Sequence, residues 1–239
     1  MVNVMLEIIK KELSSYYGYS STIVRNILFL AIFGALTIYQ LTQVVAHYGA
    51  SAHIIASGLD VLLALAAIFP VNMASGISVM AFPVERDQKT LEHLLSLPLS
   101  DSEIFLGKFI AAVIAGLTGL ALIYVVIFGF IFMSYNVSPA DLFASGSMSL
   151  MAFVICPLLV VLLILGTVAI SSHISARETY IVNLFTVFVL LGLNIAVASL
   201  NMDAQTIDEI LIVVLVPAIV IMYVIGTRSF NRESLIKSL

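Results

Sequence analysis

The sequence predicts an all-α, polytopic membrane protein with six transmembrane helices, on the strength of its apolar content and the placement of its charges. Hydrophobic residues occupy 62% of the 239 positions and charged residues only 10%, and the mean hydropathy is +1.16. Soluble domains carry about 25% charged residues, so no soluble fold could hide this much apolar surface. Apolar segments recur along the whole chain, so we expect one membrane domain over residues 1–239.

Six segments have the length and composition of membrane spans. A helix needs about 20 mainly apolar residues to cross about 30 Å of hydrocarbon, and Asp or Lys at its centre would cost about 3 kcal/mol. We predict spans at residues 24–45, 59–82, 109–134, 147–170, 180–200 and 210–227. Arg25 and Asp60 fall at the ends of these spans, and the central positions carry no charge.

The ten Lys and Arg residues predict the orientation, because cytoplasmic loops are enriched in them. All ten lie before or at the start of span one, between spans two and three, between four and five, or after six. The alternate connections contain acidic residues and no basic one. We therefore predict a cell-membrane protein with both termini in the cytoplasm. The formal net charge of −4 gives no global basic surface, which argues against a nucleic-acid partner.

Residues 2–17 have the periodicity of an amphipathic helix. The polar positions include Lys10 and Lys11. The apolar positions recur at spacings of three and four and comprise Val2, Met5, Leu6, Ile9, Leu13, Tyr16 and Tyr17. We predict an interfacial helix within residues 1–19 whose lysines meet anionic membrane lipid. A purely anchoring role and a further role both stay open.

The connection over residues 83–108 is charged and too elaborate for a turn. Residues 90–96 can form a short helix with leucines on one side, which Pro98 stops. Ser100 and Glu103 then form a capping-box pattern at the start of the next helix. An apolar stripe exposed to water needs a cover. The flanking charges favour another protein over a membrane surface.

The residues of this loop resemble a known family. The loop reads Glu85-Arg-x-x-x-Thr-Leu-Glu-x-Leu-Leu-Ser-Leu-Pro-Leu-Ser100, then Glu103-Ile-x-Leu-Gly-Lys108 and a membrane helix. This motif resembles the first cytoplasmic loop of type 2 ATP-binding cassette (ABC) exporter permeases, and residues 8–13 resemble their interfacial elbow helix. The sequence departs from the family at Gln88-Lys89, where members often carry Gly, and in the short connection 201–209, which argues against a large external gate.

The resemblance implies a coupling loop that docks on a separate ABC ATPase subunit. ATP and Mg²⁺ would be bound by that partner, and two permease chains, identical or different, would work with two ATPase copies. The ATPase-docking residues implied are the leucines of the short helix and their polar neighbours, namely Glu85, Arg86, Thr90, Leu91, Glu92, Leu94 and Leu95.

The sequence predicts no catalytic, cofactor or metal site in this chain. Its only Gly-Lys pair, Gly107-Lys108, is followed by Phe109, whereas a phosphate-binding loop needs Ser or Thr. The four histidines lack metal-ligand spacing with Cys, Asp or Glu. We therefore expect a transport subunit rather than an enzyme.

Polar residues within the spans are the candidates for a translocation path, because each must face a neighbouring helix or a wet cavity. Pro70 can kink span two and free a carbonyl just before the first of them. The candidates are Asn72, Ser75, Asn183, Thr186 and Asn194. Hydrogen bonds between packed helices are the alternative role for these side chains.

Several functions remain in competition. The leading hypothesis is the permease subunit of an ATP-driven exporter of an amphipathic or hydrophobic substrate. The alternatives are a non-conducting membrane anchor or assembly subunit for a cytoplasmic partner, a permease similar to haem exporters, and an ion-coupled carrier. The lack of deep charged residues counts against the carrier.

Overall fold

The computed structural model of the chain describes residues 2–79, 82–83, 85, 100–171, 174, 178, 181–182 and 204–229. Within these residues the fold is all-α and contains no strand. The elements are α1 (Val2–Gly18), α2 (Ser20–Tyr48), α3 (Ala52–Ala66), α4 (Ile68–Val79), α7 (Asp101–Tyr135), α8 (Pro139–Phe143), α9 (Gly146–Leu150), the π-helix η2 (Met151–Ile155), α10 (Cys156–Ser171) and α12 (Ala204–Ser229).

Five helical stretches of the described chain are long and apolar enough to cross a membrane. They are Ser20–Tyr48, Ala52–Ser78, Asp101–Tyr135, Gly146–Ser171 and Thr206–Arg228. They correspond to predicted spans one, two, three, four and six, so these spans and the all-α class are confirmed. The predicted fifth span, 180–200, lies almost entirely outside the described residues, and the total of six stays a prediction.

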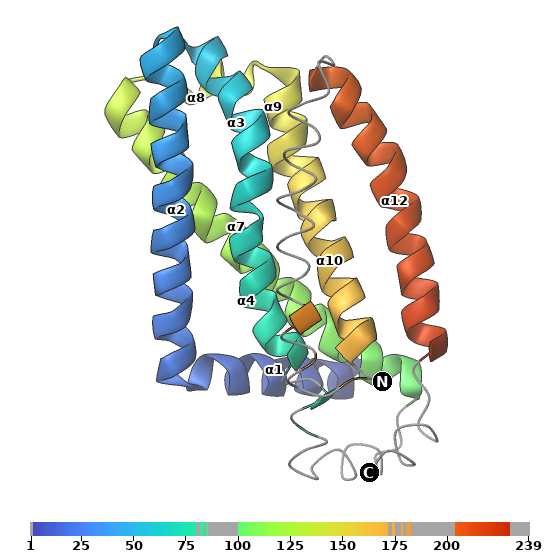
Figure 1. Cartoon of the computed structure of the whole chain (residues 1–239). Coiled ribbons are helices and arrows are strands. Elements are labelled where there is room, and N and C mark those ends of the chain that lie inside the picture. The colour runs from blue at the N-terminus through green and yellow to red at the C-terminus, as the bar shows by residue number, and fades with distance from the viewer. Residues whose placement is uncertain are drawn as a thin grey trace.

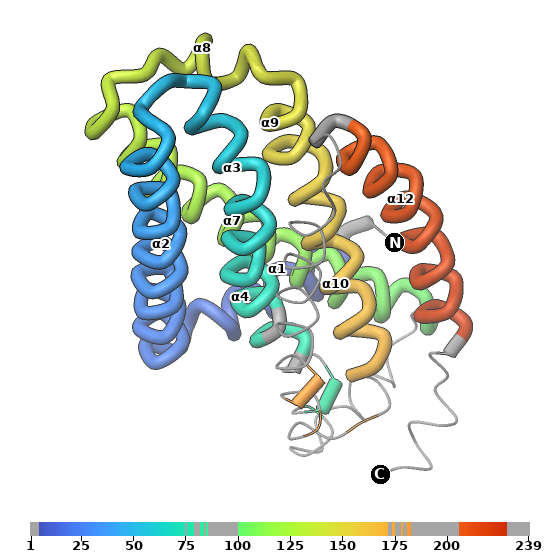
Figure 2. Tube along the Cα trace, turned by 45° about the horizontal axis from the view of Figure 1, so that its top comes forward, coloured from blue at the N-terminus to red at the C-terminus, as the bar shows by residue number. Residues whose placement is uncertain are grey.

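The long helices form a bundle that α1 closes at one end. Helices α2, α3–α4, α10 and α12 run side by side, and α7 crosses them obliquely (Figures 1 and 2). The contacts are most extensive between α4 and α7, between α10 and α12, and between α2 and α3. α8 and α9 lie at the opposite end of the bundle from α1 (Figure 1).

The N-terminal helix ends in a sharp bend. Tyr19 alone separates α1 from α2, and its extended backbone turns the chain so that α1 lies across the bundle (Figure 1). The helical periodicity was predicted, and Ile9 of the predicted apolar face is buried, but one edge of that face differs from the prediction. Leu6 is 53% exposed, whereas Ile8 and Glu12 are buried against the bundle. The location of α1 at a membrane interface stays a prediction.

The second span is broken where its proline predicts. Pro70 lacks the amide hydrogen that would bond the Ala66 carbonyl, and α3 ends at that residue, with a turn at Ala67 before α4. The N-terminal end of this span lies earlier in the sequence than the predicted start at residue 59. The helix begins at Ala52, capped by the Ser51 hydroxyl, so Asp60 lies more than two turns inside it rather than at its end.

Helix α7 approaches its neighbours closely through small residues. A Cβ at Gly116 would lie 2.6 Å from Ile164 of α10, and one at Gly119 would lie 3.1 Å from the Pro70 backbone of α4. A larger side chain at either position would require the neighbouring helix or its side chains to shift. These contacts hold α4, α7 and α10 together at the centre of the bundle.

A π-helical segment, η2, interrupts the fourth span next to a proline. The Cys156 amide donates to the Met151 carbonyl, and the next residue, Pro157, has no amide hydrogen. The Ala152 carbonyl therefore has no donor from its own helix. The Tyr124 hydroxyl of α7 donates to it at 2.7 Å and joins the two spans.

Candidate functional site

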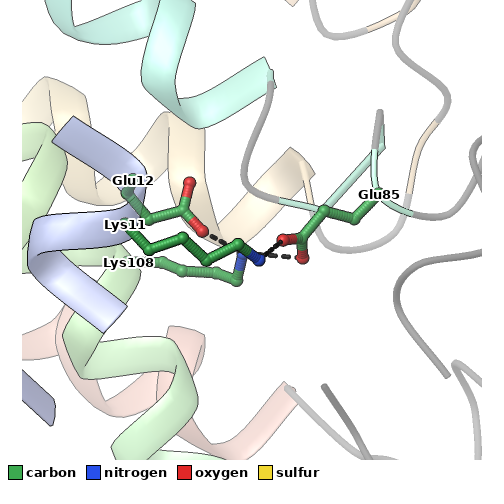
Figure 3. Close-up of polar contacts among 4 residues, drawn as sticks. All are labelled: Lys11, Glu12, Glu85 and Lys108. Atoms are coloured by element: carbon green, nitrogen blue, oxygen red, sulfur yellow. Dashed lines mark hydrogen bonds and ion pairs between the residues drawn. The ribbon is translucent and has the colours of Figure 1, made fainter. Parts of the chain in front are cut away.

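Four charged side chains meet where α1, α7 and the connection after α4 converge (Figure 3). The Lys108 ammonium donates to Glu12 Oε1 at 2.7 Å and to Glu85 Oε2 at 2.8 Å. Lys11 donates to the other oxygen of Glu85, Oε1, also at 2.8 Å. We call these four residues the ion cluster. Its two positive and two negative charges sum to zero.

Most of the ion cluster is removed from water. The Lys108 side chain is 0% exposed, and those of Glu12 and Glu85 are 6% and 10% exposed, whereas Lys11 is 59% exposed. The Lys108 ammonium also lies 5.1 Å from the centre of the Phe82 ring, within range of a cation–π attraction. A buried charge is tolerated only when it is paired and hydrogen-bonded. The carboxylates of Glu12 and Glu85 both pair with the Lys108 ammonium and accept hydrogen bonds from it.

The periodicity of each helix explains why these charges are buried. On α7, Lys108 occupies the same stripe as the buried residues Ile104 and Ala111. On α1, Glu12 falls between the buried residues Ile8 and Tyr16. This is the signal that sequence reasoning missed, because a charge on a buried stripe requires a partner of opposite charge.

A glycine beside the ion cluster brings α1 and α7 into contact. A Cβ at Gly107 would lie 3.0 Å from Ile8 Cγ2, so a larger residue would push α1 away from α7. The neighbouring ion pair between Lys108 and Glu12 forms only if α1 and α7 stay close enough for a hydrogen bond. Gly107 therefore contributes to the geometry of the ion pair as well as to the packing.

A tyrosine one turn further along α1 fixes the helix to α4 and α2. The Tyr16 hydroxyl donates to the Met73 carbonyl of α4 at 2.7 Å, and the Asn26 amide of α2 donates to that hydroxyl at 3.1 Å. Tyr16 is 1% exposed. Helix α1 is thus held to α7 by charge and to α4 and α2 by this hydrogen-bonded tyrosine.

The Lys11 ammonium stays charged in this environment. Partial burial lowers its pKa, but the hydrogen bond and the charge of Glu85, with the charge of Glu12, outweigh that and raise the pKa above its ordinary value. Lys11 therefore remains a cation at physiological pH.

One of the predicted docking residues belongs to the ion cluster. Glu85 is bonded to Lys11 and Lys108, and its role as an ATPase contact stays a prediction. The remaining docking residues lie outside the described part of the chain, namely Arg86, Thr90, Leu91, Glu92, Leu94 and Leu95. After them the predicted capping box is confirmed, because the Ser100 amide donates to Glu103 Oε2 at 2.8 Å and the Ser100 hydroxyl accepts from the Glu103 amide.

The predicted translocation residues are only partly described. Asn72 lies on α4 and is half-buried, next to the Met73 whose carbonyl accepts from Tyr16. Ser75 follows on the same helix, one turn further along. Asn183, Thr186 and Asn194 lie outside the described residues, so whether the five side chains share one surface stays untested. Among the residues that are described, no group of three His, Cys, Asp or Glu could hold a metal ion.

An apolar groove lies along α7 on its side toward α8 and η2. Its volume is about 450 Å³, and it is lined by Ala121, Tyr124, Val125, Phe128, Gly129, Phe132, Phe143 and Phe153. Aromatic rings dominate this lining, so the groove offers dispersion contacts and suits a hydrocarbon chain rather than a polar solute.

These features define a multi-pass membrane protein whose N-terminal helix is tied by buried ion pairs to the segment after its second span. The family model described as ABC-2 family transporter protein matches residues 4–210, and the chain belongs to that family. It is accordingly a membrane permease subunit of an ABC transporter, a class that partners an ABC ATPase subunit. A comparison with individual curated proteins finds no match. The family resemblance read from the loop motif is thereby confirmed.

Proposed function

We propose that the chain is the permease of an ATP-driven exporter, and that the ion cluster passes force from the ATPase to the spans. The supporting observation is the double engagement of Glu85, which bonds Lys11 of α1 and Lys108 of α7 at 2.8 Å each. A displacement of Glu85 therefore acts on α1 and α7 together.

The same ion pair closes the coupling loop at its base. Glu85 and Lys108 are 23 positions apart in the chain and in contact in space. Residues 86–99, which include most of the predicted docking residues, lie between them. A closed loop has fewer accessible conformations than an open one, so a push on its tip loses less of its effect to local rearrangement.

In the proposed arrangement, the end of the bundle that carries α1 faces the cytoplasm. Lys10, Lys11, Arg25 and Lys108 lie on α1 or on the parts of α2 and α7 that adjoin it. That distribution agrees with the enrichment of cytoplasmic segments in basic residues. ATP and Mg²⁺ would be bound by two ATPase subunits beneath a pair of permease chains.

The proposed substrate is amphipathic or hydrophobic and leaves the cytoplasm. The apolar groove on α7 and the scarcity of polar side chains on the described spans both favour a hydrocarbon-rich cargo over a sugar. A lipid, a peptide, a drug and a haem-like molecule all satisfy this chemistry.

The docking assignment is tested by charge insertion on the two sides of the predicted loop helix. Leu94→Asp places a carboxylate on the leucine side, and His93→Asp places one on a neighbouring side of the same helix. We expect Leu94→Asp to abolish co-purification with the ATPase, while His93→Asp leaves it intact. Equal retention of the ATPase by both variants would contradict the docking assignment.

Transport by the reconstituted complex separates the exporter from the anchor. Permease and ATPase are co-reconstituted in vesicles with fluorescent lipid and amphipathic dyes, and ATP is supplied on the side of the ATPase. ATP-dependent dye movement supports the exporter. ATP hydrolysis without movement of any dye supports a non-conducting assembly subunit, and movement without ATP supports an ion-coupled carrier.

A further inference from the structure

A second polar group lies at the end of the bundle opposite α1. Ser147 of α9 has its hydroxyl 2.7 Å from Asp208 Oδ2 of α12 and 3.1 Å from Asp60 Oδ2 of α3. Asp60 belongs to predicted span two and Asp208 to the connection just before predicted span six, and the fold brings the two carboxyl groups together.

Both carboxyl groups are enclosed. Asp60 is 8% exposed and Asp208 is 3% exposed. Among the described residues, Asp60 Oδ1 is the one buried side-chain oxygen or nitrogen without a hydrogen-bond partner. A buried carboxylate oxygen left bare is costly, and the usual remedies are a proton, a cation or a donor.

Within the described residues, no Lys or Arg forms an ion pair with either carboxyl group of the pair. The Lys and Arg nearest in sequence to Asp60 are Arg25 and Arg86, and those nearest to Asp208 are Arg177 and Arg228. Arg228 lies 20 residues further along α12, which is about 30 Å at 1.5 Å per residue. The ion pairs that join two described residues all belong to the ion cluster.

The other titratable groups nearby supply no cation either. At this end of the bundle, the elements packed around the pair carry His47, Tyr48, His53, Tyr124, Tyr135, Asp141, Cys156 and Glu209. Within the described chain, no hydrogen bond or ion pair joins any of them to Asp60 or Asp208. His47 and His53 are exposed, and the Tyr124 hydroxyl already donates to the Ala152 carbonyl.

The two contacts of Ser147 require more hydrogens than its hydroxyl group carries. A serine hydroxyl carries one hydrogen, yet Ser147 lies within hydrogen-bond distance of two carboxyl oxygens. If both carboxyl groups were ionised, one of these contacts would place two oxygens together with no hydrogen between them. If one carboxyl group is protonated, it donates to Ser147, Ser147 donates to the other, and both contacts become hydrogen bonds.

We propose that Asp60 and Asp208 hold one proton between them through Ser147, and that this proton clasps α3 to α12. The proton enters from water when the pair closes and returns to water when the pair opens. With the proton bound, the three groups form a chain of two hydrogen bonds with one net negative charge. Without it, two carboxylates repel across a single hydroxyl, and the contact between the two helices weakens.

The proton is observed directly by infrared spectroscopy of the full chain in lipid nanodiscs. At a pH of about 6, an exposed Asp with a pKa of about 3.9 is ionised, so a protonated-carboxyl C=O band reports an enclosed acid. We expect such a band in the unaltered chain, its displacement on ¹³C labelling of aspartate, and its loss as the pH is raised.

Substitutions then assign the band. Asp60→Asn and Asp208→Asn should each abolish it, because the remaining carboxylate accepts the single Ser147 hydrogen. Asp141→Asn, at an exposed acid bonded to Ser138, should leave it unchanged. If the Asn variants do not fold, the isotope shift in the unaltered chain still decides whether an aspartate carries the proton.

Two results would overturn the proposal. The first is the absence of an aspartate band at that pH. The second is a band that disappears on adding Na⁺ or Ca²⁺ while the thermal midpoint rises, which would assign the site to a metal cation. The experiment requires neither ATP nor the ATPase, so its outcome is independent of the proposed transport function.

Discussion

Replacing Lys108 by methionine tests whether the ion cluster is as enclosed as its geometry indicates. Methionine has nearly the length of lysine and keeps the apolar contacts of its stem, so Lys108→Met removes the charge with little change in volume. The variant leaves Glu12 without its one ion-pair partner in the described chain, while Glu85 keeps Lys11.

The expected magnitude follows from burial. Lys108 makes two ion pairs with a side chain that is 0% exposed, and removing one member of a buried pair costs about 3–5 kcal/mol of unfolding free energy. Lys11 makes one ion pair with a side chain that is 59% exposed. Such a pair contributes about 0–1 kcal/mol, so Lys11→Met is the matched control.

The unfolding free energy is measured by SDS titration of the purified chain in mixed micelles. We expect Lys108→Met to lose several times more than Lys11→Met. Adding Glu12→Gln to Lys108→Met should restore part of the loss, because it removes the uncompensated carboxylate. A cost within about 0.5 kcal/mol for Lys108→Met, or equal costs for the two lysines, would refute the assignment of a buried ion cluster.

Two further predictions use the same titration. Tyr124→Phe removes the donor to the Ala152 carbonyl and should cost about 1–3 kcal/mol, whereas Tyr39→Phe, at a residue that is 59% exposed, should change little; equal effects would contradict the π-helix explanation. Ser100→Ala removes the hydroxyl that accepts from the Glu103 amide and should cost about 1 kcal/mol, and an unchanged unfolding free energy would show that the cap is dispensable.

The features that sequence reasoning predicted correctly are local. The capping box at Ser100 and Glu103 involves residues three positions apart, and the break near Pro70 follows from one missing amide hydrogen. The five spans found in the described chain depend on composition within single segments. In each case the physical cause and its effect lie within one or two helical turns, where a sequence pattern can be read.

The start of the second span shows a limit of hydropathy. The prediction began that span at residue 59, after a segment in which Ser51, His53 and Ser57 lower the local hydropathy. The helix nevertheless begins at Ala52, since Ser51 caps it and polar residues are tolerated at the exposed end of a span. Asp60 was consequently placed at a span end instead of inside the helix, and its enclosure was missed.

The two polar clusters depend on pairings that no local pattern contains. Glu12 and Lys108 are separated by 96 positions, and Asp60 and Ser147 by 87. Periodicity could have shown that Lys108 and Glu12 each fall on a buried stripe. It could not have shown that they meet, because that depends on the bend at Tyr19 and on the close approach of α1 to α7 at Gly107.

The presence of a buried ion cluster in so apolar a chain is not explained by stability alone. Replacing a buried ion pair by well-packed apolar residues is often neutral or stabilising, so stability alone does not explain Lys108. Apolar packing tolerates many arrangements of similar volume, whereas an ion pair at 2.7 Å with two defined carboxylates tolerates few. The cluster therefore fixes one position of α1 and Glu85 relative to α7. If the chain transmits a push from its coupling loop to its spans, as we propose, it requires that fixed position more than it requires the last increment of stability.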